Sequence, residues 1–412
     1  CRIASLLIAG MSACSLMAEN VCISTPNTSL VVDATKDKEL KFMYYGQRLN
    51  AADLNSLPSS GTPNFPAYPV YGMSGASQWA LAVTHADGNL TLKMAVESVE
   101  KKAADNASIT IVHMKDTYYP LYVDVCYKAY NDVDIIETWT EIKNSEKKSV
   151  TLNRFDSAVL PIRRGNVWLS HLYGAWANEG QLAEEPLTAG MKVIENRDGT
   201  RNSHTSHAEL MFSLDGKARE NEGNVIGAAL VYSGNYKLRI NTNESEYHQL
   251  YAGIDADESE YHLAKGETFT TPALALTYSQ QGLSGASRNF HKWGRQYKLM
   301  HGNRERKILL NSWEGVYFDI NEKGMDQMMA DIASMGGELF VMDDGWFGDK
   351  YPRKTDNCAL GDWVVDKAKL PNGVGGLVET AKKHGVKFGI WIEPEMTNTL
   401  SELYEKHPDW II

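Results

Sequence analysis

Cysteine is scarce in this sequence and is not arranged for structural chemistry. The 412 residues include five cysteines, Cys1, Cys14, Cys22, Cys126 and Cys358, and three of them lie within the first 22 positions. Their spacing matches neither a zinc site nor a redox motif, so we expect no disulfide framework and no metal centre. We interpret Cys126 as a buried strand residue and Cys358 as a loop residue.

The sequence also lacks an excess of positive charge, since its formal net charge is −11 at pH 7. A nucleic-acid partner requires a basic face, and an anionic membrane attracts basic proteins, so we expect neither partner. Hydrophobic residues make up 43% of the chain and charged residues 23%, which is typical of a folded globular protein. A length of 412 residues predicts two or more domains.

No segment is apolar enough to be transmembrane, and the most suggestive apolar run lies at the N-terminus. Arg2 precedes the stretch Ile3–Met11, and small residues follow, an order typical of a secretory signal peptide. The stretch is too short to cross a bilayer. We therefore predict a signal peptide over residues 1–22 and a secreted or periplasmic protein, with lipid attachment at Cys14 as an alternative. A buried apolar strand is the remaining alternative.

Residues 28–290 read as a β domain. Leu92–Glu97 alternates apolar and polar residues, which is the period of a half-buried strand. Further segments rich in β-branched and aromatic residues follow between turn signals: Ile109–Met114, Leu121–Cys126 and Ile135–Ile142. Short strands at this spacing predict an antiparallel sandwich. The ten Trp and twenty Tyr suit carbohydrate binding, although most such rings pack in protein cores.

The pattern changes near residue 290. We predict a connecting helix over residues 291–307 and then alternating strands and helices over residues 308–412. The predicted strands are Ile308–Trp313, Glu338–Met342 and Val386–Ile392, and the predicted helices are marked by Met325–Met335, Leu377–Ala381 and Ser401–Glu405. Such units predict the first part of a (β/α)₈ barrel, with a fourth strand beginning at Trp410. A complete barrel needs roughly 250 residues, so we expect this one to be incomplete; the alternative is a small open α/β sheet.

Polar and aromatic residues follow each of the three predicted strands. Asn311–Glu314 follow the first strand, Asp343–Trp346 the second and Trp391–Glu395 the third. The carboxyl ends of the strands form the face on which parallel barrels carry their active sites. The sequence therefore predicts a site at this face.

Asp343 and Asp344 are the sharpest feature of that site. Ionised carboxylates accept hydrogen bonds from neutral diols, so the pair could bind two hydroxyls of a sugar. Gly345 behind them allows a sharp turn of the backbone. The alternatives are a pair of turn-forming residues and a metal site, for which no His or other acid lies nearby in a ligand-like pattern.

Neighbouring acids in this chain do not fit the catalytic pair of a retaining glycosidase. That pair lies about 5 Å apart, on opposite sides of the anomeric carbon. Asp343 and Asp344 are adjacent and are poorly placed to flank a substrate. Glu393 and Glu395 raise the same objection, and Pro394 between them favours a role in shaping the loop.

Taken together, these motifs resemble the α-galactosidases of glycoside hydrolase family 36. The similarity is carried in order by Asn311–Glu314 with Tyr317–Asp319, Leu339–Gly348, Leu360–Trp363, Lys369–Gly373, Lys387–Met396 and His407–Trp410. A more diffuse similarity upstream involves Tyr45–Gly46, Ala67–Gly72, Leu172–Trp176, Gly266–Glu267 and Phe290–Trp293. The resemblance covers nearly all of the chain from about residue 28.

The resemblance implies a β-supersandwich followed by a (β/α)₈ barrel and a small C-terminal β domain, with homo-oligomers in the complete protein. It implies retaining hydrolysis of terminal α-galactosides such as melibiose and raffinose, without a metal or cofactor. In this family, residues that match Asp343 and Asp344 bind galactose hydroxyls at C4 and C6, and those that match Trp313 and Trp391 line the pocket. The loop Asp349–Ala359 is longer than usual, which leaves the leaving-group preference open.

The catalytic residues themselves are expected beyond Ile412. The family nucleophile belongs to a Lys-Trp-Asp motif on the fourth strand, and the acid/base follows later; neither motif occurs in this chain. The resemblance thus implies that these residues alone are inactive. The alternatives are an α-N-acetylgalactosaminidase, a galactosyl transferase of the raffinose-synthase type and, in another class, a non-catalytic sugar-binding module.

Overall fold

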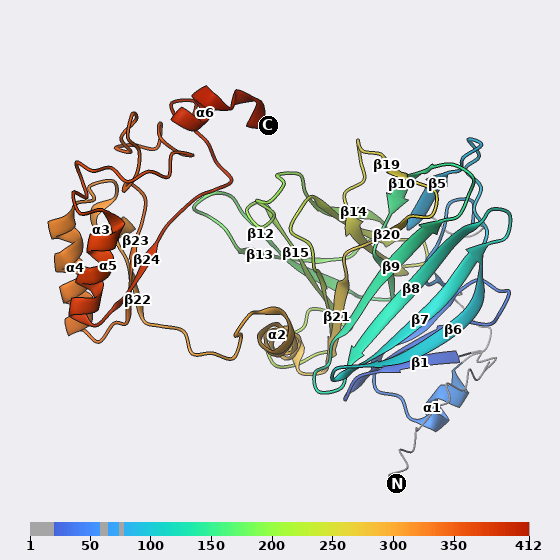
Figure 1. Cartoon of the computed structure of the whole chain (residues 1–412). Coiled ribbons are helices and arrows are strands. Elements are labelled where there is room, and N and C mark those ends of the chain that lie inside the picture. The colour runs from blue at the N-terminus through green and yellow to red at the C-terminus, as the bar shows by residue number, and fades with distance from the viewer. Residues whose placement is uncertain (1–19, 58–64, 74–77, 412) are drawn as a thin grey trace, which may run out of the picture. The chain divides into compact units, whose positions relative to one another are not determined.

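The computed structural model describes residues 20–57, 65–73 and 78–411, and the chain forms two compact units, Cys1–Gly302 and Asn303–Ile412 (Figure 1). The first unit is built mainly from antiparallel strands, and the second contains parallel strands and helices. This order confirms the predicted fold class. The boundary between the units falls inside the predicted connection.

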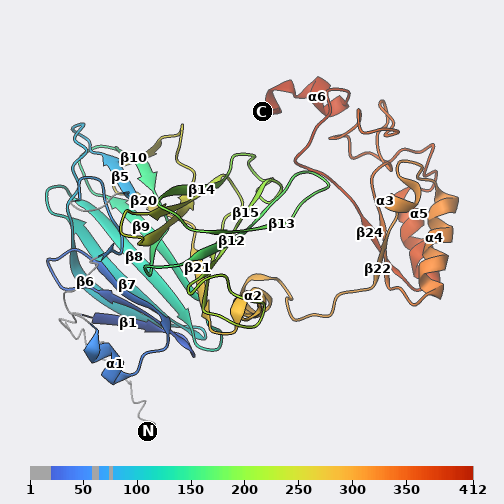
Figure 2. The same cartoon turned by 180° about the vertical axis from the view of Figure 1, so that it is seen from behind.

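The first unit contains one large sheet and three smaller ones (Figures 1 and 2). The large sheet has the order β13-β12-β15-β16-β21-β9-β8-β7-β6, with β20 paired to β9. Its strands are β6 (Met94–Ala104), β7 (Ala107–Asp116), β8 (Leu121–Tyr130), β9 (Ile136–Asn144), β12 (Trp168–Tyr173), β13 (Gln181–Pro186), β15 (Ser206–Ser213), β16 (Val225–Leu230), β20 (Thr268–Thr270) and β21 (Leu274–Ser279).

The three smaller sheets are also antiparallel and have the orders β1-β2-β3-β4, β11-β18-β17-β14 and β19-β10-β5. Their strands are β1 (Asn20–Ser24), β2 (Thr28–Asp33), β3 (Lys41–Gln47), β4 (Phe65–Pro66), β5 (Leu81–Thr84), β10 (Val150–Phe155), β11 (Ala158–Ile162), β14 (Gly190–Asn196), β17 (Tyr236–Thr242), β18 (His248–Ile254) and β19 (Tyr261–Leu263). The short helix α1 (Ala51–Ser56) follows β3.

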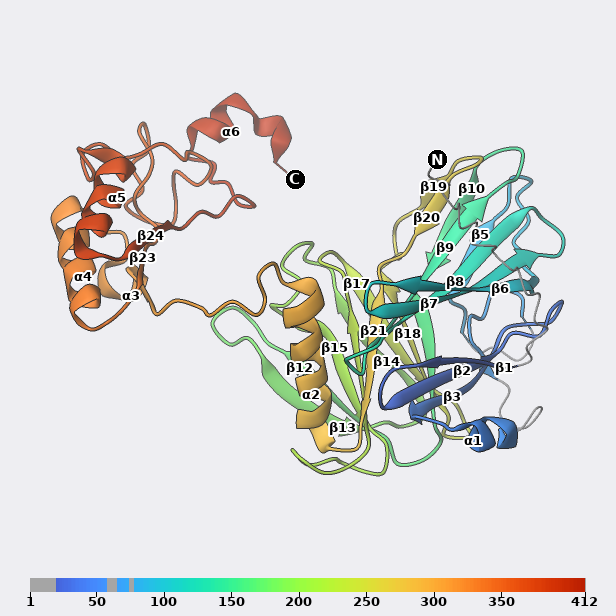
Figure 3. The ribbon, with the colours of Figure 1, turned by 60° about the horizontal axis from the view of Figure 1, so that its bottom comes forward.

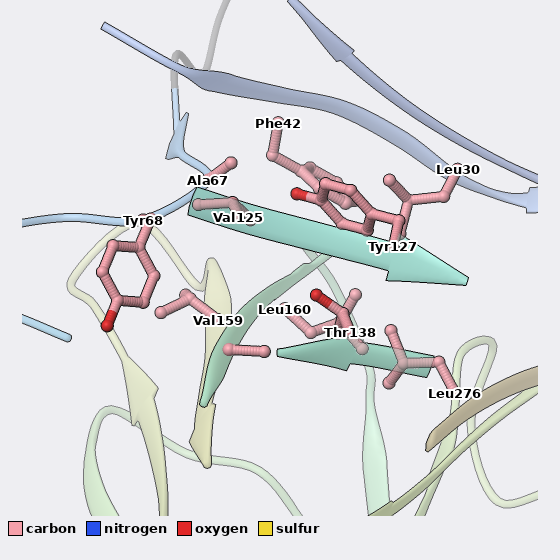
Figure 4. Close-up of a pocket in the computed structure, with 11 residues that line it drawn as sticks. Leu30, Phe42, Ala67, Tyr68, Val125, Tyr127, Thr138, Val159, Leu160 and Leu276 are labelled. Atoms are coloured by element: carbon pink, nitrogen blue, oxygen red, sulfur yellow. The ribbon is translucent and has the colours of Figure 1, made fainter. Parts of the chain in front are cut away.

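Side chains from several sheets interlock to form the core of this unit. Figure 4 shows one such contact, where Leu30 of β2, Tyr127 of β8 and Leu160 of β11 face a common space. The space left between them is only about 10 Å³. Close packing of this kind is the main source of stability in a sandwich, because alternate side chains of each strand point inward and are buried away from solvent.

The N-terminal edge of the sandwich differs from the prediction. The β structure begins at Asn20 rather than at residue 28, and Val21 is 2% exposed within the core. The predicted signal peptide over residues 1–22 therefore extends too far, because residues 20–22 belong to β1. Residues 1–19, including Cys14, lie outside the described part of the chain.

The connecting helix also has different bounds from those predicted. Helix α2 spans Gly282–Trp293, continues as a π-helical turn over Gly294–Lys298 and packs on β16 and β21 of the large sheet (Figure 3). Residues 299–307 contain no helix, contrary to the prediction over residues 291–307. Asn303–Lys307 has no apolar side chain with which a helix could pack.

The second unit is a three-stranded parallel sheet with the order β22-β23-β24, whose strands are Leu309–Asn311, Leu339–Met342 and Lys387–Ile390. The helices are α3 (Trp313–Val316), α4 (Glu322–Ser334), α5 (Gly373–His384) and α6 (Glu402–Lys406). The predicted strand at Trp410 is wrong. Pro408–Trp410 forms a 3₁₀ turn, for which Pro408 supplies a suitable fixed φ angle.

Helices α4 and α5 follow their sequence signals closely. In α4 the Asn321 side chain caps the N-terminus by accepting a hydrogen bond from Gly324 N, and Met325, Met329 and Ile332 are buried. Met335, predicted to belong to this apolar face, follows the last helical turn and is 72% exposed. No helix in the described residues is long and apolar enough to cross a membrane.

Limited proteolysis tests the division into two units. Residues 299–308 contain no helix or strand and Arg304–Lys307 are exposed, so trypsin should cut first after Arg304 or Arg306. We expect the N-terminal fragment to persist, which mass spectrometry of a time course can identify. Lys101, exposed within β6, is the internal control and should remain uncut. Early cleavage inside the sandwich would contradict the division.

Candidate functional site

The three parallel strands bring the predicted site residues to one edge of the second unit. β22, β23 and β24 are neighbours, and their register aligns Asn311 with Val341 and Met342 with Ile390. The chain leaves all three strands in the same direction, so the residues that follow them share the carboxyl edge of the sheet. Trp313, Asp343 with Asp344, and Trp391 all lie just beyond this edge.

Asp343 is held by the end of the neighbouring strand. Asn311 Nδ2 donates a hydrogen bond of 2.6 Å to Asp343 Oδ2, and Asp343 N donates to Ser312 Oγ over 3.0 Å. The amide of Asp344 donates to Asp343 Oδ1 over 2.7 Å. Asp343 is 9% exposed, so its carboxylate is nearly buried, and the two described donors that bond it, Asn311 Nδ2 and Asp344 N, are neutral.

Asp344 is paired instead with a buried cation. Arg353 Nε donates to Asp344 Oδ1 over 2.9 Å, and Arg353 Nη2 donates to Asp344 Oδ2 over 2.7 Å. The two residues are 5% and 2% exposed, respectively. Such a two-pronged pair fixes the plane of the carboxylate as well as its position.

The two predicted tryptophans are linked to this pair through aromatic rings. The Trp313 ring packs edge-on against Tyr317 and Phe318, while Trp391 stacks with Phe347 at 6.5 Å between ring centroids. The Arg353 guanidinium lies over the rings of both Phe318 and Phe347. A continuous set of contacts therefore links the loop after β22 to the loop after β24.

Gly345 allows the chain to turn directly behind the two aspartates. Its φ angle is +109°, a region that side chains with a Cβ disfavour. A Cβ at this position would lie 2.9 Å from Phe318 Cα. The predicted role of Gly345 is thereby confirmed, and the close approach to Phe318 adds a second reason for glycine.

Lys369 ties the surrounding loops together. Its Nζ donates to the carbonyl oxygens of Phe318, Gly345 and Arg353 over 2.7, 2.7 and 2.8 Å. These bonds use all three donors of the ammonium group. Burial lowers the pKa of Lys369, and the neighbouring Asp366 and Asp319 offset that effect only in part.

Two further buried carboxylates have structural partners. Asp362 accepts hydrogen bonds from Glu402 N and Leu403 N over 2.8 and 2.9 Å, so it caps the N-terminus of α6. Asp366 Oδ1 accepts from Ala368 N over 2.8 Å and stabilises a turn. Glu393 and Glu395, predicted to shape their loop, lie half-buried and exposed beyond β24.

Arg353 and Asn398 were not predicted as site residues. Asn398 Oδ1 accepts a hydrogen bond of 3.1 Å from Arg353 Nη1, and both lie in loops without a distinctive motif. The available signal was indirect: two adjacent buried carboxylates require compensation, and Arg353 is the arginine in the loop that follows them. No group of His, Cys, Asp and Glu in the described residues is arranged to hold a metal ion.

Two family profiles cover most of the chain. The Glycosyl hydrolase family 36 N-terminal domain matches residues 38–264, and Melibiase matches residues 268–412. The chain belongs to glycosyl hydrolase family 36. The Melibiase match includes all four predicted site residues, although their individual roles stay predictions.

Curated relatives that match this chain include α-galactosidases. AgaA of Geobacillus stearothermophilus is 35% identical over 87% of this chain, and Mel36A of Lactobacillus acidophilus is 34% identical over 87%. These matches cover 49% and 50% of the two relatives, so the chain spans about half the length of the curated relatives it matches.

Solved family-36 structures share the fold. The crystal structure of the Geobacillus AgaA enzyme matches 95% of this chain with a TM-score of 0.88 and 29% identity, and 58% of that enzyme is covered. Variants of AgaA solved in complex with raffinose and with stachyose match with TM-scores of 0.88 and 0.86. These likenesses confirm the predicted resemblance.

Substituting Gly345 tests the turn behind the aspartates. Gly345→Ala forces an alanine to φ +109° and against Phe318, so it should lower the free energy of unfolding by about 1–3 kcal/mol. Chemical denaturation followed by tryptophan fluorescence measures this change. Gly375→Ala is the control, because Gly375 lies within α5 with open space around it and alanine should be neutral or slightly stabilising there. Equal effects at both positions would contradict the turn argument.

Proposed function

We propose that this chain carries the sugar-binding side of the active site of an exo-acting, retaining α-galactosidase. The observation that carries the proposal is the pair of buried aspartates at the exit of β23, fixed by Asn311 and Arg353. Family membership adds that its named relatives include α-galactosidases, of which AgaA variants have been solved with raffinose and stachyose.

The chemistry of the two carboxylates suits the hydroxyl groups of a terminal sugar. A carboxylate has about four lone-pair positions, and the arginine occupies roughly two of those on Asp344. The remaining positions on Asp343 and Asp344 can accept hydrogen bonds from neighbouring hydroxyls. Trp313 and Trp391 are partly exposed and offer aromatic surface against which the apolar face of a pyranose can pack.

Binding, rather than bond cleavage, is the role that fits Asp343 and Asp344. Retaining hydrolysis needs one carboxylate as nucleophile and another as acid/base, about 5 Å apart across the anomeric carbon. Asp343 and Asp344 follow one another on one strand exit, and Asp344 is ion-paired. We propose that the nucleophile belongs to a Lys-Trp-Asp motif encoded downstream of Ile412 in the same reading frame.

The test is to extend the reading frame beyond Ile412 and assay the product on an aryl α-galactoside. Turnover would support the proposal, and absence of turnover on α-galactosides would reject it. Parallel assays with an aryl α-N-acetylgalactosaminide, and with sucrose as galactosyl acceptor, address the two alternatives in the same class. A downstream sequence without the Lys-Trp-Asp motif would favour a non-catalytic sugar-binding module.

Secretion and oligomerisation also belong to the proposal. The apolar run Ile3–Met11 supports export to the periplasm or the medium, with Cys14 as an alternative lipid anchor. Cell fractionation with and without a Cys14→Ser change tests this localisation. Size-exclusion chromatography with light scattering tests whether the extended protein forms homo-oligomers.

Replacing Asp343 tests the sugar contact directly. Asp343→Ala in the extended enzyme should lower kcat/KM about 10- to 100-fold, because a hydrogen bond from a hydroxyl to a charged acceptor contributes about 1.5–3 kcal/mol. The loss should shrink for the 4-deoxy or 6-deoxy galactoside that lacks the contacted hydroxyl. Asp349→Ala, at an exposed aspartate of the next loop, should leave kcat/KM unchanged. Equal losses of kcat/KM on the parent galactoside and on its 4-deoxy and 6-deoxy analogues would indicate a folding role for Asp343.

A further inference from the structure

Arg353 has more partners than a simple ion pair requires. Besides its two bonds to Asp344, its Nη1 donates to Cys358 O over 2.7 Å and to Asn398 Oδ1 over 3.1 Å. Four of the five N–H groups of the guanidinium are therefore engaged. With 2% exposure, the side chain has little freedom to leave this arrangement.

The Arg353 side chain is also confined from the aromatic side. Its guanidinium lies 5.3 Å from the centroid of the Phe318 ring and 5.7 Å from that of Phe347. Phe318 lies between α3 and α4, and Phe347 follows β23. Arg353 is thus held by rings from two different connections in addition to its hydrogen bonds, which favours a single orientation of its planar group.

Asn398 extends the network to the loop after β24. Its Oδ1 also accepts a hydrogen bond of 3.0 Å from Leu360 N, and its Nδ2 donates to Asp356 O over 3.1 Å. One amide therefore binds the guanidinium and two points of the loop that carries it. The orientation of Arg353 depends on two loops that are far apart in sequence.

Asp343 provides a contrast within the same strand exit. Its carboxylate oxygens accept hydrogen bonds from Asn311 Nδ2, at the end of β22, and from Asp344 N, just beyond β23, and both donors are neutral. In the described structure the Asp344 carboxylate accepts no such bond from a strand, and the side-chain donors that bond it all belong to Arg353. The position of Asp344 thus depends on a loop residue.

We infer that Arg353 is a positioning residue for substrate binding, which holds the Asp344 carboxylate in the orientation that accepts a sugar hydroxyl. This inference rests on the proposed α-galactosidase function. The two-pronged pair occupies one side of the carboxylate and leaves the other lone pairs for the substrate. Because the carboxylate is fixed before the sugar arrives, no ordering is needed at the moment of binding.

Kinetics of the extended enzyme on an aryl α-galactoside test the inference through a double-mutant cycle. Arg353→Gln should lower kcat/KM about 100-fold, the scale expected when a binding group is misplaced by about 1 Å. Arg353→Lys keeps the positive charge but lacks the planar pair of guanidinium donors, so it should lower kcat/KM about 10-fold. In the background of Asp344→Asn, adding Arg353→Gln should cost no more than a few-fold, because the group it positions is already altered.

Two further variants make the outcome decisive. Lys350→Gln, an exposed change in the same loop, should keep kcat/KM and the melting temperature. If Arg353→Gln does not fold, Asn398→Ala replaces it in the same cycle with Asp344→Asn, and a loss of about fivefold from one hydrogen bond is expected.

If the extended wild type shows no turnover, the proposed function itself is rejected, and with it the inference on Arg353. With an active wild type, two results would overturn the inference. One is wild-type kcat/KM in Arg353→Gln with a lowered melting temperature, which would mean that Arg353 only stabilises the fold. The other is a loss of kcat/KM in the double variant that equals the product of the losses in the two single variants, which would mean that Arg353 acts independently of Asp344.

Discussion

A buried carboxylate requires an ion-pair or hydrogen-bond partner. The arrangement of the second unit depends on this constraint at Asp344. An unpaired buried charge costs several kcal/mol, and removal of one partner of a buried pair typically costs about 3–5 kcal/mol. Arg353 meets the requirement with two parallel hydrogen bonds. Because Arg353 lies on a loop, the loop itself must be fixed, and this explains why Asn398, Cys358 O and two aromatic rings hold it.

The same requirement explains the contacts of Lys369. Its Nζ donates hydrogen bonds to the carbonyl oxygen of Phe318, in the connection between β22 and β23, and to those of Gly345 and Arg353, in the connection after β23. A lysine that donates to three carbonyls acts here as a fixed centre of backbone contacts, although burial of its charge is unfavourable and lowers its pKa. These polar contacts therefore add to the apolar packing of loop residues such as Phe347 and Leu370 in ordering the loops around the site.

The helices and strands could be predicted from the sequence where apolar residues repeat with a single period along a segment. Met325, Met329 and Ile332, within the predicted segment Met325–Met335, form the buried face of α4. The edge shared by Asp343, Asp344 and the two tryptophans followed from the parallel order of the strands. Arg353 and Asn398 could not be predicted in the same way, because their contacts join loops far apart in sequence. Such contacts produce no repeating pattern in the amino-acid sequence. The tail at Pro408–Trp410 was misjudged because a short apolar run alone does not distinguish a strand from a turn.

Adjacent aspartates with different partners need not have the same effect on a bound sugar. Asp344 and Arg353 together are close to neutral, whereas the donors around Asp343 carry no charge, so Asp343 is the uncompensated negative charge of this pair. In the proposed reaction the sugar develops positive charge as an oxocarbenium-like transition state. A fixed negative charge nearby favours that state over the neutral substrate, and low exposure limits the screening of this effect by water. Under the proposed function, Asp343 is therefore expected to act on the transition state, whereas Asp344 with Arg353 is expected to orient the bound sugar.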